Sequence, residues 1–262
     1  NRKIPEFPAS FWRETEIPSF QKLEEDITVD VAIVGGGITG ITTGYLLAKE
    51  GVKTAIIEAG KILTGTTGHT TAKITAQHGL IYDELIQHFG EEKAKLYYDA
   101  SIDSLNFIKT TVEQNQIDCD FREQDAVIYS VSDEYAEKLQ KEWKAYEKLN
   151  IAGKMIDSIP FNIDIKNGIA MPGQAQFHPL KYLRELVRLF VNAGGMVYEN
   201  TTAEDIEDGD HPTVLLRNGK RIKCQYLIAA SHFPFCDKKG LYFARMYVER
   251  AYVLGIKTDK EY

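Results

Sequence analysis

Three glycines, spaced as in phosphate-binding turns, lie near the start of this chain of 262 residues. Gly35, Gly37 and Gly40 form the pattern G-x-G-x-x-G between an apolar run (29–34) that predicts a buried strand and a helical pattern over 38–51. The first glycine allows a tight turn, the second lets backbone N–H groups approach a pyrophosphate, and the third lets the helix lie close to the sheet. Because a helix N-terminus attracts anions, this segment predicts a dinucleotide site.

An acidic residue follows at the spacing expected for ribose recognition. Residues 53–58 are typical of a second strand, and Glu58 ends it 23 residues after Gly35. A carboxylate there accepts hydrogen bonds from ribose hydroxyls and disfavours a 2′-phosphate, because two anions would meet. The pattern G-x-G-x-x-G alone also fits a glycine-rich turn without a ligand. The strand, turn, helix, second strand and acid together are more specific.

The segment TGTTGHTTAKITAQHG (64–79) has neither strand alternation nor a helical stripe of apolar residues. A solvated loop is one interpretation. Threonine hydroxyls and glycine N–H groups also suit a pyrophosphate and the ribityl chain of a flavin. About a hundred residues of mostly helical sequence then precede a second nucleotide-domain pattern at 196–232. A simple nicotinamide dehydrogenase has its third strand much sooner, so this layout favours FAD over NAD.

The remaining patterns predict an interrupted domain. Asn218-Gly219, between two alternating runs, predicts a hairpin. His178-Pro179 predicts a helix start with a histidine N-cap, and Ser132 is a second candidate N-cap. Further elements are expected as helices over 80–90, 91–116, 132–149 and 178–195, a strand, turn and strand over 119–131, and strands over 169–173, 225–232 and 245–257.

We therefore expect an α/β protein with a Rossmann-like FAD-binding domain, whose central parallel sheet is interrupted by a second, α+β substrate domain. The FAD-binding domain would comprise 1–80 and 172–240, beginning with an extended arm over 1–28. The substrate domain would comprise 81–171 and 241–262. No sequence after 245–257 would close a sheet, so we expect the chain to be the N-terminal part of a longer protein.

Composition narrows the classes of partner. The net charge is −7, and no basic run stands out, which disfavours nucleic acid and anionic lipid surfaces. The most apolar stretch, Val29–Ala48, contains five glycines and is not expected to enter a membrane. Three widely spaced cysteines predict neither a disulfide framework nor a metal site, and a reducing cytoplasm is the simplest compartment.

Several stretches resemble one family. The sequence DVAIVGGGITGITTGYLLAKEGVKTAIIEAG, followed by TGTTGHTTAKI, resembles the FAD-dependent D-amino acid oxidase superfamily, which includes glycine oxidase and sarcosine oxidase. YENTTAEDI and YLIAASH resemble its later flavin-contacting strands. FWRETEIPSF, GTTGHTTAKITAQHG, IYDELIQHFG and IDCDFREQDAVIYSV resemble a bacterial subgroup in which an FAD oxidoreductase is joined to a C-terminal Rieske iron–sulfur domain.

The resemblance implies an enzyme that transfers a hydride from a C–N bond of an amine or amino acid, or from a C–O bond of a 2-hydroxy acid, to flavin N5. A small-molecule substrate and an electron-transfer domain or protein would be its partners. The Cys-x-His and Cys-x-x-His ligands of a Rieske centre are absent from this sequence, so a 2Fe-2S cluster would belong to a domain outside it.

The resemblance also assigns cofactor-binding residues. The glycine turn with Ile38 and Thr39 would hold the pyrophosphate, and Glu58 with Ala59 the adenosine ribose. The remaining assignments are Thr66, Thr67, His69, Thr70 and Thr71 along the pyrophosphate–ribityl stretch, Ala203 near the adenine, and Ala229 and Ala230 near the ADP half.

His69 is the most distinctive of these residues. GTTGHTTA resembles the G-T-T-W-H-T/A-A-G stretch of dimethylglycine and sarcosine dehydrogenases, in which the matching histidine is bonded to the flavin, although Gly68 replaces the tryptophan here. A covalent bond, a non-covalent contact and a purely structural role all remain open for His69. Lys73 and His78 are candidate catalytic residues that would stabilise the reduced, anionic flavin. A surface lysine and a capping histidine are the alternatives.

Other candidates and classes also remain open. Arg245, Tyr247, Arg250 and Tyr252 could present one strand face to a substrate carboxylate, or form a solvated edge strand. An NAD-dependent Rossmann dehydrogenase is the alternative enzyme class. A non-catalytic nucleotide-binding module is the alternative outside catalysis.

Overall fold

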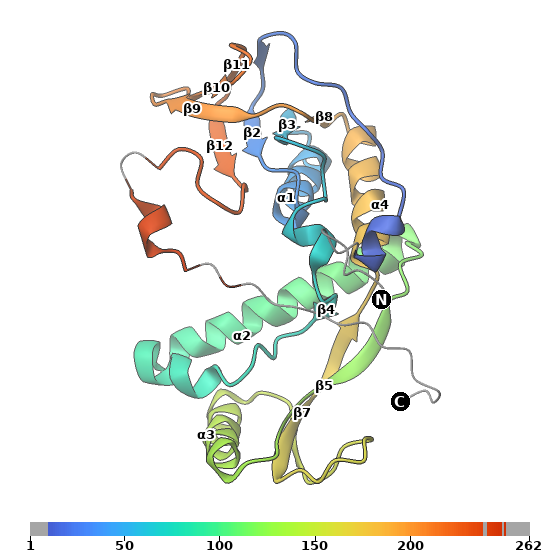
Figure 1. Ribbon diagram of the computed structural model, residues 1–262, viewed down its shortest axis with the longest axis vertical. Coiled ribbons are helices and arrows are strands. Elements are labelled where there is room, and N and C mark those ends of the chain that lie inside the picture. Colours follow the sequence, from blue (N-terminus) through green and yellow to red (C-terminus); the bar gives the residue numbers. More distant parts are fainter. Residues whose placement is uncertain (1–9, 238–239, 248, 250–262) are drawn as a thin grey trace, which may run out of the picture. The chain divides into compact units, whose positions relative to one another are not determined.

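The computed structural model describes residues 10–237, 240–247 and 249, and Figure 1 shows its elements. The described residues form two compact units. One contains the chain up to Thr71 and again from His178, and the other is Ala72–Phe177. The domain boundaries expected from the sequence lie at 80/81 and 171/172, whereas the chain passes between the two units at 71/72 and 177/178. The described residues after 240, expected in the substrate domain, group with the first unit.

The first unit contains the expected central parallel sheet. Its strands are β12 (Tyr226–Ala229), β2 (Val31–Val34), β3 (Thr54–Ile57) and β8 (Met196–Tyr198), in that order, and every neighbouring pair is parallel. Helix α1 (Ile38–Lys49) connects β2 to β3, as the sequence predicts. Because β2 and β3 are buried along their whole length, they are continuous apolar runs rather than alternating ones.

A second sheet covers one face of this parallel sheet. It consists of β1, β11, β10 and β9 in that order, and the hairpin predicted at Asn218-Gly219 connects β10 to β11. Apolar residues of both sheets, among them Val34, Ile57, Val214 and Ile222, form one buried core. The bounds of these strands are β1 (Ile27–Thr28), β9 (Ala203–Glu207), β10 (Thr213–Leu216) and β11 (Arg221–Lys223).

Helices α1 and α4 (Pro179–Asn192) lie side by side next to the parallel sheet (Figure 1). Gly44 of α1 permits this close packing. A Cβ atom there would lie 2.8 Å from Ile56 Cδ1 and 3.3 Å from Phe190 Cε2. The N-cap of α4 is His178, whose side chain accepts a hydrogen bond from the Lys181 N–H, which confirms the predicted helix start.

The second unit contains an antiparallel sheet and two helices, α2 (Tyr82–Asn115) and α3 (Asp133–Leu149). Strand β7 pairs with β5 along one side and with β4 and β6 along the other. The pairing of β4 with the end of β7 explains why the segment after Thr71 belongs to this unit. The strand bounds are β4 (Lys73–Ile74), β5 (Arg122–Ser130), β6 (Lys154–Ile156) and β7 (Asn167–Gln176).

The prediction of a strand, a turn and a second strand over 119–131 is wrong. One continuous strand, β5, spans this region, and its register shifts between Gln124 and Ala126. This irregularity leaves the polar residues that suggested a turn within the strand, because a β-bulge accommodates an unpaired residue without ending the ladder. The helices predicted over 80–90 and 91–116 are confirmed as two helical segments of α2 that meet at Gly90 (φ 83°, ψ 166°).

A buried carboxylate joins the two helices of the second unit. Glu142 of α3 accepts hydrogen bonds from the N–H groups of Ile81, Tyr82 and Asp83 at the start of α2, at 2.9–3.1 Å. Burial raises the pKa of this carboxyl, and the three N–H donors oppose the rise. Glu142 therefore caps the otherwise unpaired N–H groups of a helix distant in sequence. Ser132 caps α3, as predicted.

The ends of the described chain depart from expectation. From Ser10 onward the arm is largely extended, but Phe11–Glu14 forms a short 3-10 helix, η1, with Ser10 as its N-cap. The strand predicted over 245–257 is wrong over its described residues. Arg245 ends a 3-10 helix, η3 (Tyr242–Arg245), and Tyr247 lies in no regular element. Arg250 and Tyr252 lie outside the described residues. Within the described ranges, no helix is long and apolar enough to cross a membrane.

Candidate functional site

The glycine turn lies at the carboxyl end of the parallel sheet. Gly35 follows β2 with φ +118°, a conformation that L-residues rarely adopt, and a Cβ atom there would lie 2.3 Å from the Ala230 carbonyl oxygen. The Gly35 N–H donates to Ile57 O at 2.8 Å, and the Ala230 N–H donates to Val34 O at 2.8 Å. The turn is therefore wedged between the ends of β3 and β12, where only glycine fits.

The start of α1 packs directly on this turn. A Cβ atom at Gly40 would lie 1.9 Å from the Gly35 carbonyl oxygen, so the helix could not begin here with any larger residue. The Ile38 N–H donates to Thr67 Oγ1 at 3.0 Å. The N–H groups of Gly37, Thr39 and Gly40 have no acceptor within the described residues. These unpaired donors at a helix start suit phosphate oxygens.

The Glu58 carboxylate is held beside the turn. One of its oxygens accepts from the Gly36 N–H and the other from the Gly60 N–H, both at 2.9 Å. Each carboxylate oxygen has a further lone pair, so the oriented group can still accept hydrogen bonds from a diol. Ala59, the next residue, is exposed.

The polar segment is anchored rather than solvated throughout. Residues Thr66–His69 form a 3-10 helix, η2. Gly68 is buried, and a Cβ atom there would lie 2.8 Å from the Leu63 carbonyl oxygen, so the tryptophan of the resembling motif has no room. His69 is exposed, as are Thr66 and Thr71, and its ring has no hydrogen-bond partner in the described part of the chain.

The structure brings most of the predicted cofactor residues together. The glycine turn, Glu58, Thr67 and Ala230 are linked by the contacts above, and Ala229 ends the neighbouring strand β12. Ala203 is connected less directly. Its side chain is buried between the two sheets, and it follows by two residues Thr201, whose N–H donates to Glu58 O at 2.9 Å.

Sequence reasoning missed one supporting carboxylate. Glu199, directly after β8, is almost fully buried and accepts from the Ile62 N–H at 3.0 Å and from the Phe20 N–H at 3.1 Å. It therefore joins the segment after Glu58 to the N-terminal arm. An acid at the end of a buried strand was the available signal, but its two partners lie more than a hundred residues away in sequence.

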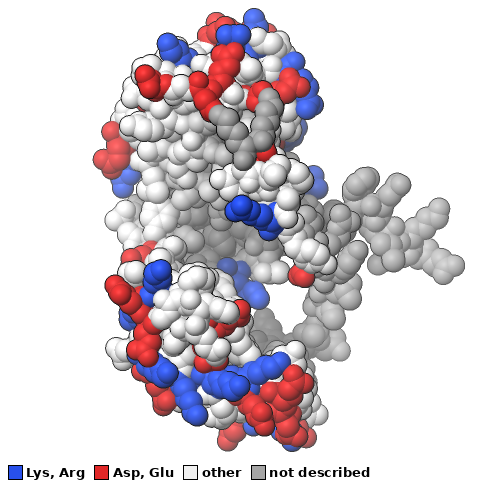
Figure 2. All heavy atoms as spheres, turned by 90° about the vertical axis from the view of Figure 1, so that its left-hand side faces the viewer, with Lys and Arg blue, Asp and Glu red and all other residues white. Residues whose placement is uncertain are grey.

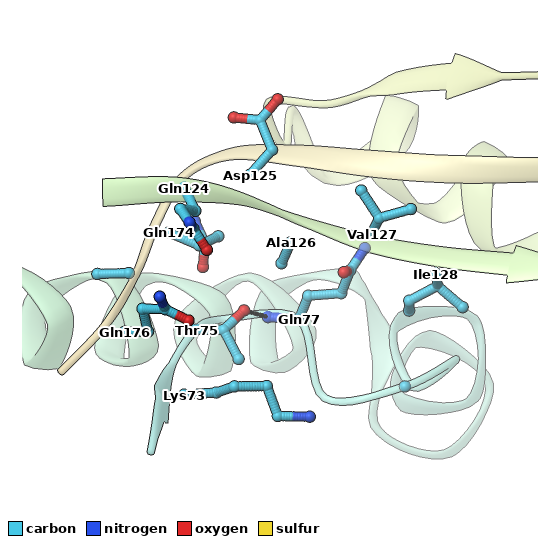
Figure 3. Close-up of a pocket in the computed structure, with 12 residues that line it drawn as sticks. Lys73, Thr75, Gln77, Gln124, Asp125, Ala126, Val127, Ile128, Gln174 and Gln176 are labelled. Atoms are coloured by element: carbon cyan, nitrogen blue, oxygen red, sulfur yellow. Dashed lines mark hydrogen bonds between the residues drawn. The ribbon is translucent and has the colours of Figure 1, made fainter. Parts of the chain in front are cut away.

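The second unit contains a pocket of about 410 Å3 that is lined by both polar and apolar side chains. Figure 3 shows Lys73, Thr75 and Gln77 along one side and residues of β5 and β7, including Gln124, along the other. The wall at 75–77 is fixed by Gln174 Oε1, which accepts from the Ala76 N–H, and by the Tyr82 hydroxyl, which donates to Ala76 O, at 2.7 and 2.5 Å. Both backbone groups of Ala76 in this wall are thus hydrogen-bonded, and the pocket combines apolar lining with a few polar side chains, as ligand sites commonly do.

The two candidate catalytic residues are placed differently. Lys73 lines the pocket, its side chain is exposed, and it forms no ion pair with any described residue. His78 is not among the lining residues, and its Nδ1 lies 3.1 Å from the Tyr97 hydroxyl of α2. Of the two candidates, Lys73 rather than His78 is therefore among the described residues that line the pocket.

The surface charges are mixed. On the face in Figure 2, basic side chains lie among acidic ones rather than in one basic area. The described residues contain no group of three His, Cys, Asp or Glu side chains that could hold a metal ion. The residues that point to chemistry are therefore the glycine turn, Glu58, the polar segment and the pocket around Lys73.

The chain is similar in sequence to several known proteins. The family model DAO, described as FAD dependent oxidoreductase, matches residues 30–261. The chain is 48% identical over 258 residues to "Putative Rieske 2Fe-2S iron-sulfur protein YhfW" of Bacillus subtilis, covering 98% of this chain and 51% of that protein. It is 24% identical over 226 residues to gamma-glutamylputrescine oxidoreductase of Escherichia coli, covering 84% and 52%. The chain thus spans about half the length of these relatives.

Solved structures share the fold. Glycine oxidase from Geobacillus kaustophilus aligns with a TM-score of 0.61 and 20% identity, over 78% of this chain and 55% of that one. L-proline dehydrogenase from P. horikoshii aligns with a TM-score of 0.64 and 19% identity, over 79% and 53%.

The geometry at Gly35 gives a direct stability prediction. Gly35→Ala should lower the free energy of unfolding by at least about 2 kcal/mol, because it combines a strained φ with a collision against Ala230 O. Gly51→Ala is the matched control, with φ +78° but nothing within 4 Å, and should cost about 1 kcal/mol. Urea unfolding of both variants measures the difference. Equal losses would contradict the wedged turn.

Proposed function

This chain belongs to the DAO family of FAD-dependent oxidoreductases, and from that premise we propose that its first unit binds FAD through the glycine turn, Glu58 and η2. The observation that carries the proposal is the set of N–H groups at the start of α1 that have no acceptor among the described residues, beside the oriented Glu58 carboxylate. The N–H groups supply donors for a pyrophosphate, and the carboxylate supplies acceptors for a ribose diol. The family match sets aside the nicotinamide-dependent alternative.

We propose that the protein oxidises an amine or amino acid at a C–N bond. A 2-hydroxy acid, oxidised at its C–O bond, is the less favoured substrate. Bound FAD supplies the hydride acceptor for this reaction. The name of the similar gamma-glutamylputrescine oxidoreductase supports the amine class. The name of the 48% identical relative supports electron transfer to a Rieske-type 2Fe-2S domain. The residues of this chain then have to bind the substrate and orient it.

The pocket of the second unit is the proposed substrate site. Its cation Lys73, which forms no ion pair with a described residue, can pair with a substrate carboxylate, and the neighbouring Gln77 and Gln124 offer amide donors and acceptors.

Anaerobic reduction of the FAD-loaded protein tests this function. We expect an amino acid or amine to bleach the flavin absorption, because the flavin accepts the two electrons of the C–N bond. Absorbance is followed for amines, amino acids and 2-hydroxy acids in parallel. A flavin that none of these compounds reduces would favour the non-catalytic module instead.

Lys73 provides the internal control for that experiment. Lys73→Met should raise the half-saturating concentration of a carboxylate-bearing substrate about tenfold or more, because a charge-assisted hydrogen bond is lost. Lys73→Arg keeps the charge and should change it less. A simple amine without a carboxylate should show no difference between the variants. A uniform loss for all substrates would contradict the assigned role.

We also propose that His69 contacts the flavin without a covalent bond. The ring at the end of η2 is exposed and has no partner among the residues that the structure describes, which supports a contact. Gly68 in place of tryptophan is the departure from the covalent motif. Acid precipitation of the FAD-loaded protein should therefore release the flavin into the supernatant. Flavin in the pellet, with a matching mass shift on the His69 peptide, would establish the covalent link instead.

A further inference from the structure

The N-terminal 3-10 helix η1 is bonded to the polar segment. Trp12 Nε1 donates to the Thr70 carbonyl oxygen at 2.8 Å, across 58 residues of sequence. Thr70 follows directly after η2. That helix contains Thr67, whose hydroxyl accepts a hydrogen bond from the Ile38 N–H of α1, and the exposed His69. A single indole N–H therefore ties the arm to the segment that carries these two side chains.

The same tryptophan rests on a fixed support. Its ring meets the His178 ring edge-on, with the ring centroids 4.8 Å apart. His178 is buried, and its Nδ1 accepts from the Lys181 N–H as the N-cap of α4, while its Nε2 lies 3.3 Å from Thr15 Oγ1. Because His178 is held by α4, it gives Trp12 one defined position.

A third contact covers the buried glycine of η2. A Cβ atom at Gly68 would lie 3.5 Å from Arg13 Cγ and 3.6 Å from Arg13 Cδ, so the apolar stem of Arg13 passes over this position. Leu63 O closes the other side of Gly68. Residues 12, 13 and 15 therefore touch residues 70, 68 and 178, and all three contacts lie within the first unit.

Bonds within the segment and to its neighbours accompany these contacts with the arm. Within 64–71, the Gly68 N–H donates to Gly65 O, and outside contacts are made by the Thr64 and Thr67 hydroxyls. Ordering a backbone costs about 1–2 kcal/mol per residue, and glycine loses the most freedom. A segment already ordered before ligand binding avoids that cost at the moment of binding.

We propose that Trp12 is a positioning residue, which holds the segment 66–71 in the conformation that receives FAD. The inference rests on the proposed function, since it concerns the same cofactor site. Trp12 acts through Thr70 and the support of His178. Arg13 contributes by covering Gly68. The N-terminal arm is thereby part of the cofactor-binding machinery rather than a surface strap.

Trp12→Phe tests the proposal, because it keeps a ring against His178 and removes the indole N–H. Two quantities are measured: hydrogen exchange of the 64–71 peptides in the chain without FAD, and the FAD dissociation constant. Both should rise about fivefold, the usual effect of losing one hydrogen bond. Arg13→Ala, a change at an exposed side chain, should raise exchange in the same peptides by a smaller factor.

Asp26→Ala is the matched control on the same arm. Asp26 Oδ1 accepts from the Arg221 N–H at 2.9 Å, away from the polar segment. This variant should change the unfolding midpoint without changing FAD affinity or exchange over 64–71. If Trp12 only supported overall stability, both variants would show the same changes in exchange over 64–71 and in FAD affinity. The comparison therefore separates positioning from structural support.

The outcomes are distinct. Selective exchange over 64–71 together with weaker FAD binding supports the proposal. Unchanged exchange overturns it, and so does raised exchange with unchanged FAD affinity. A wild-type chain that takes up no FAD would contradict the proposed function, and it would remove the positioning role even if exchange shows that Trp12 orders the segment.

Discussion

The close approach of Gly35 to Ala230 on one side and to Gly40 on the other is the constraint on which this site depends. A Cβ atom added at Gly35 would lie 2.3 Å from Ala230 O, and one added at Gly40 would lie 1.9 Å from Gly35 O, so neither glycine has room for a side chain. This contact places the first turn of α1 at the carboxyl end of β2, with Glu58 beside it. The N–H groups of Gly37, Thr39 and Gly40 there have no acceptor among the described residues. A turn that only glycine can form, between a buried strand and a helix start, is typical of dinucleotide sites.

The polar segment 64–79 is held by residues from distant parts of the sequence. The Ile38 N–H at the start of α1 donates to Thr67, and the Trp12 indole donates to the Thr70 carbonyl. Glu199 binds the chain just upstream, at Ile62. A segment rich in threonine and glycine would otherwise lose much conformational entropy on binding a ligand. Its polar composition therefore coexists with a defined conformation, because the anchors lie outside it.

Local signals accounted for much of the fold. The strand, turn, helix, strand and acid from Val31 to Glu58, the hairpin at Asn218-Gly219 and the cap at Ser132 are each encoded by neighbouring residues. Long-range pairing was not predictable in this way. The pairing of β4 with β7, which shifts the unit boundary, and the bulge beside Gln124 depend on partners far along the chain. The supporting roles of Glu199 and Trp12 were missed for the same reason.

The central claim is that the glycine turn and Glu58 recognise the ADP half of FAD. Titration of the protein with FAD and with FMN, followed by flavin absorbance and fluorescence, tests it directly, because FMN lacks the adenosine and the second phosphate. The account predicts that FAD binds and that FMN binds at least roughly a hundredfold more weakly, since charge-assisted hydrogen bonds are lost. Equal affinity for FAD and FMN would contradict it.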